Sequence, residues 1–372
     1  MRKLNICLVS LTIAPDSQDG SAKFFRGIFD YLKKQGHNVQ LITGYWNIRL
    51  NDPNIHQINL IRKSYFWIPQ FSLKVERFLK SYNFDIIHGN SPKGSLPLIL
   101  SKKTRFISTL HDTGPFESDF SLIPIEKYLF KRVVKKAKML TTCSEHMKWE
   151  IRKIIPEVNT NNIFNLYSAI ENKYKPYPEE AIKLKKILGI HGPVLLYIGR
   201  IAKYKGVHHI ITAYKIAKKK IPKLNLVIGG KPDFYMEKYY QDWKRKYKDI
   251  IHFLGFISEK EIPIYYSMAD IFVNYSYASE GFGLTPIEAI ACGTPVICSS
   301  LLAYKEVLQD NVIYVPPKNP KLLAEEIVKL VNDDARRKTI VNKAQKYIER
   351  YTWDAVGKKL EKVYSKFLKL DI

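Results

Sequence analysis

A carboxylate and two glycines form the segment of this 372-residue chain in which the residue types point most clearly to chemistry. Glu280 stands directly before Gly281, and Gly283 follows after one aromatic residue. Glycines this closely spaced allow a backbone to approach a ligand. Helix capping does not explain Glu280, and a loop carboxylate beside such glycines suits hydrogen bonding to hydroxyl groups.

A helix is predicted to begin immediately after this loop. Thr285 is a favourable N-cap, Pro286 suits the first helical position, and Glu288 stands three residues after the threonine, as in a capping box. The free N–H groups of such a helix would point back at the glycine-rich loop, which is the geometry of an anion site. Glu288 therefore has two interpretations: it caps the helix, or it contacts the same ligand.

Two cations follow residues 194–198, an apolar stretch typical of a buried strand. Arg200 and Lys205 precede a helical pattern that begins at Val207, and cations at a helix N-terminus oppose the helix dipole. This placement is poor for stability but suits a bound diphosphate, held by both side chains and by the helix N–H groups. The alternative is that both are surface cations, and Lys203 is expected to be a bystander.

The first half of the chain offers weaker signals. Gly20 precedes a helical pattern over residues 24–32, but it is not part of a G-x-G-x-x-G fingerprint, which argues against a nicotinamide enzyme. His111 follows the apolar run 106–110, at the ligand-facing end of a strand if a parallel sheet forms. A single histidine there is more often structural than catalytic, so both roles stay open.

Short apolar stretches alternate with helical patterns along the whole chain, which predicts an α/β fold with parallel sheets covered on both faces. The predicted strands are residues 6–11, 39–43, 85–88, 106–110, 139–143 and 162–166, then 194–198, 224–228, 251–254, 271–274, 295–298 and 312–315. Two such series predict two doubly wound, Rossmann-like domains that face each other across a cleft. The proline-containing stretch 174–193 is the natural linker.

Composition narrows the choice of partner. Sixty Lys and Arg against 35 Asp and Glu give a net charge of +25, which indicates an anionic partner: nucleic acid, an acidic membrane surface or a phosphorylated substrate. No window approaches the roughly 18 consecutive apolar residues of a membrane-spanning helix. Four cysteines without a C-x-x-C pair predict small core residues in a reducing cytoplasm: Cys7, Cys143, Cys292 and Cys298.

Taken in order, these segments resemble the retaining glycosyltransferases of family 4, which have the two-domain GT-B fold, over nearly the whole chain. The Glu-x7-Glu signature of that family is matched by Glu280 and Glu288, and its G-R-x4-K-G element by Arg200 and Lys205 with their flanking glycines. Further matches are Gly20, His111, Gly229-Gly230-Lys231, residues 268–273, Val315-Pro316-Pro317 and the closing segment after Tyr351-Thr352-Trp353.

The resemblance implies how the chain is divided. Residues 1–172 would form an acceptor-binding Rossmann-like domain, 173–192 a linker, and 193–352 a nucleotide-sugar-binding Rossmann-like domain. Residues 353–372 would form a helix that packs back on the first domain.

The resemblance also implies roles for single residues. Arg200 and Lys205 would hold the diphosphate of a nucleotide-sugar donor, Glu288 its ribose hydroxyls and Glu280 the hydroxyls of its sugar. The other expected contacts are the backbone N–H groups of Phe282, Gly283 and Leu284 to sugar and phosphate, His111 to the sugar near the reacting centre, and Gly20 where the first loop approaches the phosphate. No cofactor and no metal is expected, because the cations supply the positive charge.

Three segments depart from the family pattern. They are Asp19-Gly20-Ser21 in place of a glycine pair, Ser168-Ala169-Ile170-Glu171 in place of Asn-Gly-Val-Asp, and residues 299–305 in place of a glycine-rich segment. These departures concern the identity of the acceptor and of the donor sugar rather than the class of reaction.

The expected reaction is transfer of a hexosyl group to a hydroxyl of a glycan or lipid-linked sugar. Departure of a nucleoside diphosphate develops negative charge, which Arg200, Lys205 and a helix dipole would stabilise. Since no carboxylate pair can be assigned as nucleophile and acid, we expect front-face transfer with retention of configuration. The alternatives are a GT-B phosphorylase, a sugar-nucleotide epimerase or a basic nucleic-acid-binding protein; the last lacks an aromatic RNP element, zinc spacing and a concentrated basic stripe.

The positive charge also predicts where the protein works. We expect a cytoplasmic protein that associates reversibly with the anionic cytoplasmic face of a membrane, chiefly through Lys131, Arg132, Lys135 and Lys136. The alternative is a solvated basic surface and a soluble acceptor.

Overall fold

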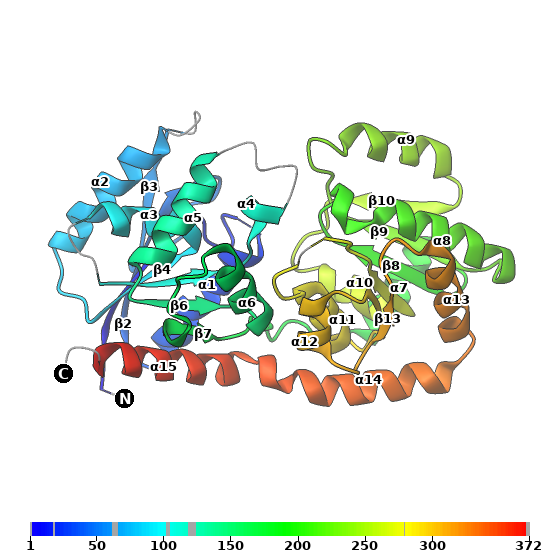
Figure 1. Ribbon diagram of the computed structural model, residues 1–372. Helices are drawn as coiled ribbons and strands as arrows, with labels where there is room; N and C mark the ends of the chain where they lie inside the picture. The colour runs from blue at the N-terminus through cyan, green and yellow to red at the C-terminus, as the bar shows by residue number, and fades with distance from the viewer. Residues whose placement is uncertain are drawn as a thin grey trace. The chain divides into compact units, whose positions relative to one another are not determined.

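Two parallel sheets organise the chain, as the alternation of apolar and helical segments predicts (Figure 1). The computed structural model describes residues 2–17, 19–61, 66–101, 105–117, 124–278 and 280–369. These divide into a first unit, Met1–Ala169 with Trp353–Ile372, and a second unit, Ile170–Thr352. In the described ranges, no helix is both long and apolar enough to cross a membrane.

The first unit contains a seven-stranded sheet in the order β3-β2-β1-β4-β5-β6-β7. Its elements are β1 (Asn5–Ser10), α1 (Gly20–Lys34), β2 (Asn38–Tyr45), β3 (Ile55–Asn59), α2 (Trp67–Lys80), β4 (Ile86–Asn90), α3 (Ser91–Leu100), β5 (Ile107–Leu110), α4 (Gly114–Glu117), α5 (Pro124–Lys136), β6 (Met139–Thr142), α6 (Glu145–Ile154), η1 (Thr160–Asn162), β7 (Ile163–Asn165) and α15 (Trp353–Lys369). The order of the strands reverses between β1 and β4, where doubly wound folds bind their ligands.

The second unit contains a six-stranded sheet in the order β10-β9-β8-β11-β12-β13, which reverses between β8 and β11. Its elements are α7 (Pro178–Ile187), β8 (Val194–Ile198), η2 (Lys203–Lys205), α8 (Val207–Lys220), β9 (Asn225–Gly229), α9 (Glu237–Tyr247), β10 (Ile251–Gly255), α10 (Ile262–Met268), β11 (Ile271–Asn274), α11 (Leu284–Ala291), β12 (Val296–Ser299), α12 (Leu302–Leu308), β13 (Ile313–Val315), α13 (Pro320–Val331), α14 (Asp334–Ile348) and η3 (Glu349–Tyr351).

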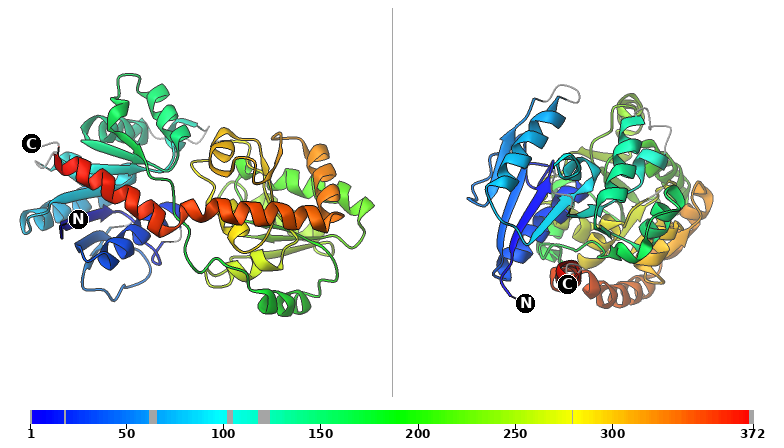
Figure 2. Two further views of the ribbon diagram at one scale, coloured as in Figure 1. Left: turned by 90° about the horizontal axis from the view of Figure 1, so that it is seen from below. Right: turned by 60° about the vertical axis from the view of Figure 1, so that its left-hand side comes forward.

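Alternate residues of the first sheet pack against different helices, because successive side chains of a strand point to opposite faces. Leu8 packs in a core with residues of α1 and α15, whereas its neighbour Val9 packs in a core with α2. In β6, Met139 faces the core of α1 and α15, and Leu140 faces α5 and α6. Helices α1 and α15 therefore cover one face of the sheet, and α2, α5 and α6 cover the other (Figure 2).

The last helix, α15, lies in the first unit, where the resemblance places it (Figure 1). It docks on α1 through two glycines that accept aromatic rings. A Cβ added to Gly27 would lie 1.8 Å from a ring carbon of Trp353, and one added to Gly357 would lie 2.2 Å from a ring carbon of Tyr31. Because neither glycine has room for a side chain, the contact between the two helices is close.

Residues 173–192, which were expected to form a linker, lie in the second unit and include the helix α7. Pro178 occupies the start of α7, a position where its missing N–H costs nothing. The helix is held to the sheet by Lys185, whose ammonium lies 3.2 Å from Asp270 Oδ2, and by the buried Ala181. The same carboxylate oxygen accepts the Val194 N–H at 2.8 Å. Proline here marks a helix start rather than an independent connection.

Candidate functional site

The second unit brings two of the expected side chains together at the point where its sheet reverses. Strands β8 and β11 are adjacent and parallel, so the loops that follow them leave the sheet side by side. The first loop approaches the second at Gly206, which has φ +68°, and a Cβ there would lie 2.3 Å from the carbonyl oxygen of Tyr275. This close approach places Lys205 beside Glu280.

Lys205 and Glu280 form an ion pair in a mostly enclosed position. Lys205 Nζ lies 2.5 Å from Glu280 Oε1, and the two side chains are 18% and 13% exposed. The same carboxylate oxygen accepts the Ser276 hydroxyl at 2.6 Å. Burial alone would lower the pKa of Lys205, but the charge and hydrogen bond of Glu280 raise it above its ordinary value. Glu280 therefore balances the charge of Lys205, which the sequence analysis expected to oppose the helix dipole.

Arg200 lies at the same edge of the sheet and is exposed. Its Nη2 donates to the Tyr204 hydroxyl at 2.9 Å, and its carbonyl accepts the Tyr197 hydroxyl at 2.8 Å. The guanidinium carbon lies 5.9 Å from the centre of the Tyr204 ring, and Lys205 Nζ lies 5.2 Å from it. The two expected cations thus flank one aromatic side chain, which the sequence analysis did not identify.

The Gly229-Gly230-Lys231 turn supports the loop that carries Arg200. A Cβ added to Gly230, which has φ +131°, would lie 1.9 Å from the carbonyl oxygen of Gly199. The two loops are also joined beyond the strands by a parallel bridge between Ile201 and Pro232. These glycines bring the loops after β8 and β9 into contact.

The helix after the glycine-rich loop begins earlier than expected. Its N-cap is Gly283, with φ +92°, and α11 starts at Leu284, so Thr285 and Pro286 lie inside the first turn. The Thr285 hydroxyl accepts the Asn274 amide at 3.2 Å instead of capping the helix. The predicted capping box is therefore wrong, and the physical reason is that glycine adopts the left-handed N-cap conformation without strain.

Glu288 is buried at 6% exposure on α11. Its Oε2 accepts the hydroxyl of Tyr266 at 3.1 Å. Burial first, and then the charge of Glu288, raise the pKa of Tyr174 far above the ordinary range. The capping interpretation of Glu288 is therefore wrong, and the contact with a ligand stays a prediction. The sequence analysis missed both tyrosines, because they lie on segments distant from residue 288.

The three residues expected to offer backbone N–H groups lie at the start of α11, where the first N–H groups of a helix have no partner within the helix. Phe282 turns its side chain inward and is 5% exposed. Its ring contacts Tyr351 edge to face, with centroids 5.2 Å apart. The packing of Phe282 therefore fixes the backbone position of Gly283 and Leu284.

His111 lies at the carboxyl end of β5 in the first unit, and its ring joins three strands. Nε2 lies 2.7 Å from Asn90 Oδ1 at the end of β4. Asn90 Nδ2 in turn donates to Ser10 Oγ at the end of β1, at 2.9 Å. Since the Asn90 oxygen accepts, Nε2 of His111 carries the proton and Nδ1 remains an acceptor.

The electrostatics of His111 agree with a neutral ring. Burial lowers its pKa from 6.5 to about 4, although the nearby carboxylates of Asp112 and Asp19 act in the opposite direction. His111 is thus uncharged at neutral pH and can accept a hydrogen bond from a hydroxyl group. Asn90, which orients it, was missed; its signal was a polar residue at the end of a buried strand.

Gly20 is the first residue of α1 and is exposed. The residue before it, Asp19, caps this helix by accepting the Ala22 N–H at 2.8 Å and the Ser21 hydroxyl at 2.5 Å. A carboxylate therefore occupies the start of α1, in a loop where the family pattern has a glycine pair. Gly20 and His111 belong to the first unit, and Arg200, Lys205, Glu280 and Glu288 belong to the second.

None of the four cysteines forms a disulfide, and all are buried, as predicted. In the described part of the chain, no group of three or more His, Cys, Asp or Glu side chains is arranged to hold a metal ion.

Comparison with known proteins gives one consistent result. Residues 19–162 match the model of "Glycosyltransferase Family 4", and residues 180–347 match that of "Glycosyl transferases group 1". An uncharacterized glycosyltransferase of Methanocaldococcus jannaschii is 27% identical over 97% of this chain and 98% of its own. The O-antigen chain mannosyltransferase B of Escherichia coli is 25% identical over 74% of this chain and 73% of its own.

Solved structures agree on the fold. The Anabaena protein HepE in complex with UDP-glucose superposes with a TM-score of 0.81 at 18% identity, covering 98% of this chain and 100% of that chain. This likeness extends over both parallel sheets, and the two family models together span most of the sequence. The chain therefore belongs to the family 4-like glycosyltransferases with the GT-B fold.

Proposed function

We propose that this glycosyltransferase moves a hexosyl group from a nucleoside-diphosphate sugar to a hydroxyl of a glycan or lipid-linked acceptor, with retention of configuration. The observation that carries the proposal is the group formed by Arg200, Lys205 and Glu280 at the reversal of the second sheet. Two cations and a carboxylate at that edge suit a ligand with a diphosphate next to a hydroxylated ring. The mannosyltransferase name of one relative supports transfer of a hexose.

In the proposed reaction, the bond between the anomeric carbon and the diphosphate oxygen breaks as the acceptor oxygen attacks from the same face. The departing phosphate takes the proton of the acceptor hydroxyl, so no side chain has to act as a base. Arg200 and Lys205 stabilise the charge that develops on the diphosphate. Glu280 accepts hydrogen bonds from the sugar, Glu288 from the ribose, and the neutral His111 from a sugar hydroxyl near the reacting centre.

The proposal includes no metal ion, because two side-chain cations supply the positive charge. The transfer rate is therefore expected to be the same with a chelator as with Mg²⁺. A rate that depends on added divalent cation would contradict this part of the proposal.

Product analysis tests the function directly. The protein is incubated with UDP-, GDP- and ADP-sugars and a mixture of glycan and lipid-linked acceptors, and sugar, phosphate, nucleotide and glycoside are separated. Formation of a glycoside and a free nucleoside diphosphate, with the anomeric configuration of the donor retained by NMR, is the expected result. A sugar phosphate would indicate a phosphorylase, and an isomerised nucleotide sugar would indicate an epimerase.

We further propose that the first unit associates reversibly with an anionic membrane surface through α5 and α6. Both helices pack over one core and expose basic residues, among them Lys131, Arg132 and Lys136. They also expose two aromatic side chains, Tyr128 at 58% and Trp149 at 52%. Exposed aromatic rings beside lysines suit the headgroup region of a bilayer, whereas a purely solvated basic face does not need them.

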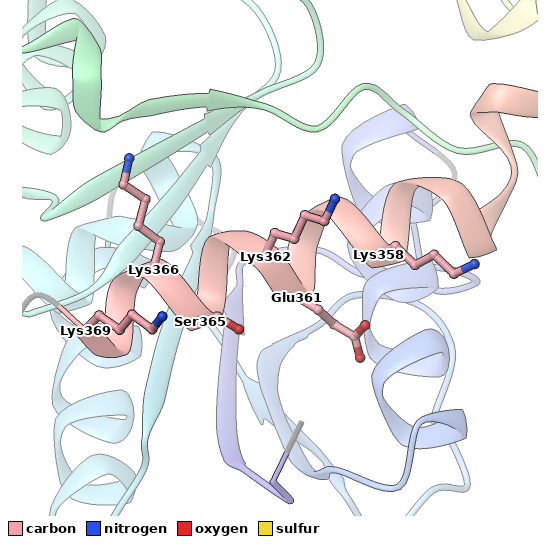
Figure 3. Close-up of a pocket in the computed structure, with 6 residues that line it drawn as sticks. All are labelled: Lys358, Glu361, Lys362, Ser365, Lys366 and Lys369. Atoms are coloured by element: carbon pink, nitrogen blue, oxygen red, sulfur yellow. The ribbon is translucent and has the colours of Figure 1, made fainter.

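A second basic surface lies on the opposite face of the same sheet. A hollow along α15 is lined by Lys358, Glu361, Lys362, Ser365, Lys366 and Lys369 (Figure 3). A flat membrane cannot contact α5 and α15 at the same time, because the sheet separates them. We favour α5 and α6, since among the lining residues of the α15 surface there is no aromatic side chain.

A further inference from the structure

Tyr304, on α12, lies directly beneath the glycine-rich loop and is fully buried. A Cβ added to Gly283 would lie 2.8 Å from its Cε1, so the ring fills the space that this glycine leaves. Residues 299–305, to which Tyr304 belongs, are one of the segments in which the chain departs from its family pattern. Tyr304 therefore lies beside the proposed donor-binding residues of the second unit, although it is not part of any family motif.

The hydroxyl of Tyr304 is buried and has no hydrogen-bond partner in the described residues. Two other tyrosine hydroxyls around this site are partnered: Tyr197 donates to the Arg200 carbonyl at 2.8 Å, and Tyr275 donates to the Pro316 carbonyl at 2.5 Å. The hydroxyl of Tyr174, beside Glu288, is buried and has no partner in the described residues either. An unpartnered buried hydroxyl destabilises the protein, so its retention calls for a functional explanation.

Two of the groups that act on this hydroxyl belong to the site, namely Glu280 and Ser276. Burial first, and then the charge of Glu280, raise the pKa of Tyr304 well above its ordinary value, and the Ser276 hydroxyl lies next to it. Ser276 donates its proton to Glu280 Oε1, which leaves the lone pairs of its oxygen available as acceptors. Tyr304 can therefore donate to Ser276, and Ser276 to Glu280.

This arrangement matters once a diphosphate competes for Lys205. Lys205 and Ser276 both donate to Glu280 Oε1. If the Lys205 ammonium moves toward the phosphate, Ser276 is the donor of this pair that still holds the Glu280 carboxylate. We propose that Tyr304 is a positioning residue, which donates to Ser276 and so keeps Glu280 oriented toward the donor sugar when Lys205 engages the diphosphate. The inference rests on the proposed function and assigns a role in sugar recognition to a residue outside the motifs.

The test separates recognition of the sugar from recognition of the nucleotide. Tyr304→Phe keeps the ring beneath Gly283 and removes only the hydroxyl. Its affinities for nucleoside diphosphate and for the matching nucleotide sugar are measured by calorimetric titration, with kcat and KM for transfer. The expected result is unchanged affinity for the diphosphate and about tenfold weaker affinity for the nucleotide sugar, the effect of one hydrogen bond to a charged network.

Tyr214→Phe is the matched control. Its side chain is likewise buried in the same unit, but its hydroxyl donates to the Ile250 carbonyl, at 2.6 Å. This variant is expected to lose stability while the ratio of the two affinities stays as in the wild type. The double variant Tyr304→Phe/Ser276→Ala is expected to bind the nucleotide sugar as tightly as Ser276→Ala alone, because both changes interrupt the same chain of hydrogen bonds from Tyr304 through Ser276 to Glu280.

Each other outcome has a definite meaning. An equal loss for both ligands, or no loss for either, overturns the positioning role of Tyr304 and makes the ring a space-filling residue. Additive effects in the double variant overturn the relay through Ser276. A wild-type protein that binds neither nucleoside diphosphates nor nucleotide sugars overturns the proposed function itself, and the inference with it.

Discussion

Lys205 Nζ lies 2.5 Å from Glu280 Oε1, so the cation proposed to hold the donor diphosphate and the carboxylate proposed to hold the donor sugar are one ion pair. The pair joins the loops after β8 and β11, which are separated by a long stretch of sequence. Any ligand that attracts Lys205 therefore also changes the surroundings of Glu280. Binding of the diphosphate and recognition of the sugar are coupled by this contact.

Lys205→Ala is expected to reduce stability as well as activity. It leaves the Glu280 carboxylate, 13% exposed, without its cation. The expected loss in the free energy of unfolding is about 1–3 kcal/mol, below the range for fully buried pairs. Urea denaturation measures it, and the double variant Lys205→Ala/Glu280→Gln should recover part of it. A wild-type stability for Lys205→Ala would contradict the importance of the pair.

Arg200→Ala is expected to behave differently, because Arg200 is exposed and its side chain donates to the Tyr204 hydroxyl. Its melting temperature should match that of the wild type, whereas kcat/KM should fall by the equivalent of about 2–4 kcal/mol of transition-state stabilisation. Lys203→Ala is the control for a nearby cation. Wild-type turnover in Arg200→Ala would remove this residue from the diphosphate site.

The sequence predicted the site better where motifs are contiguous than where the fold assembles them. Arg200, Lys205 and Glu280 were identified from loops that follow buried strands, and the structure brings them to one edge. The ion pair between Lys205 and Glu280 could not be predicted from the sequence, because it depends on β8 and β11 being neighbours in the sheet. Tyr266 and Asn90 were missed for the same reason.

The elements of the fold were also predicted well where the local sequence determines them and poorly where it does not. Continuous apolar strands such as Val194–Ile198 were predicted with their observed bounds, because burial on both faces leaves a strong signal. Strand β3 was missed, since only Ile55 and Ile58 of its five residues are buried, as suits an edge strand. The start of α11 was misplaced because Gly283 caps it through its backbone conformation rather than through a side chain.

Glu288→Gln is expected to leave the fold intact and weaken nucleotide binding. The amide oxygen can still accept the Tyr266 hydroxyl, whereas a ribose hydroxyl loses a charge-assisted hydrogen bond worth about 1.5–3 kcal/mol. Calorimetric titration with a nucleoside diphosphate measures the change, and circular dichroism confirms the fold. Unchanged affinity would show that Glu288 serves only to satisfy Tyr266.

The histidines of the first unit predict a loss of stability in mild acid. Burial lowers the pKa of His111 from 6.5 to about 4, and burial together with His111 lowers that of His88 to about 3. Between these values and 6.5 the unfolded chain binds protons that the folded chain does not. The free energy of unfolding therefore falls as the pH decreases from about 6.5 to 4.

His111→Asn isolates one of these contributions. Without the titrating ring, the decrease in unfolding free energy between pH 7 and pH 4 should be smaller than in the wild type. Urea denaturation across this range measures the two slopes. Identical slopes would mean that His111 is not held neutral by its surroundings.

Charge reversal distinguishes the two basic surfaces of the first unit. Lys131→Glu/Arg132→Glu on α5 should abolish flotation with anionic vesicles, whereas Lys358→Glu/Lys362→Glu on α15 should not. Binding of the wild-type protein should weaken as salt increases, because each contributing cation is screened. If neither pair of changes affects flotation, the charge is a solvated surface; if only the α15 pair does, the surfaces have been assigned the wrong way round.

The docking of α15 on α1 has a consequence for biosynthesis. The ribosome produces α1 and its sheet before the second unit, but α15, which covers part of their apolar face, is made after the whole second unit. Until Trp353 and the residues after it emerge, the surface around Gly27 and Tyr31 has no cover. The first unit therefore completes its core only after the second unit has been synthesised, in the reverse of their order along the chain, and α15 is the helix that closes it.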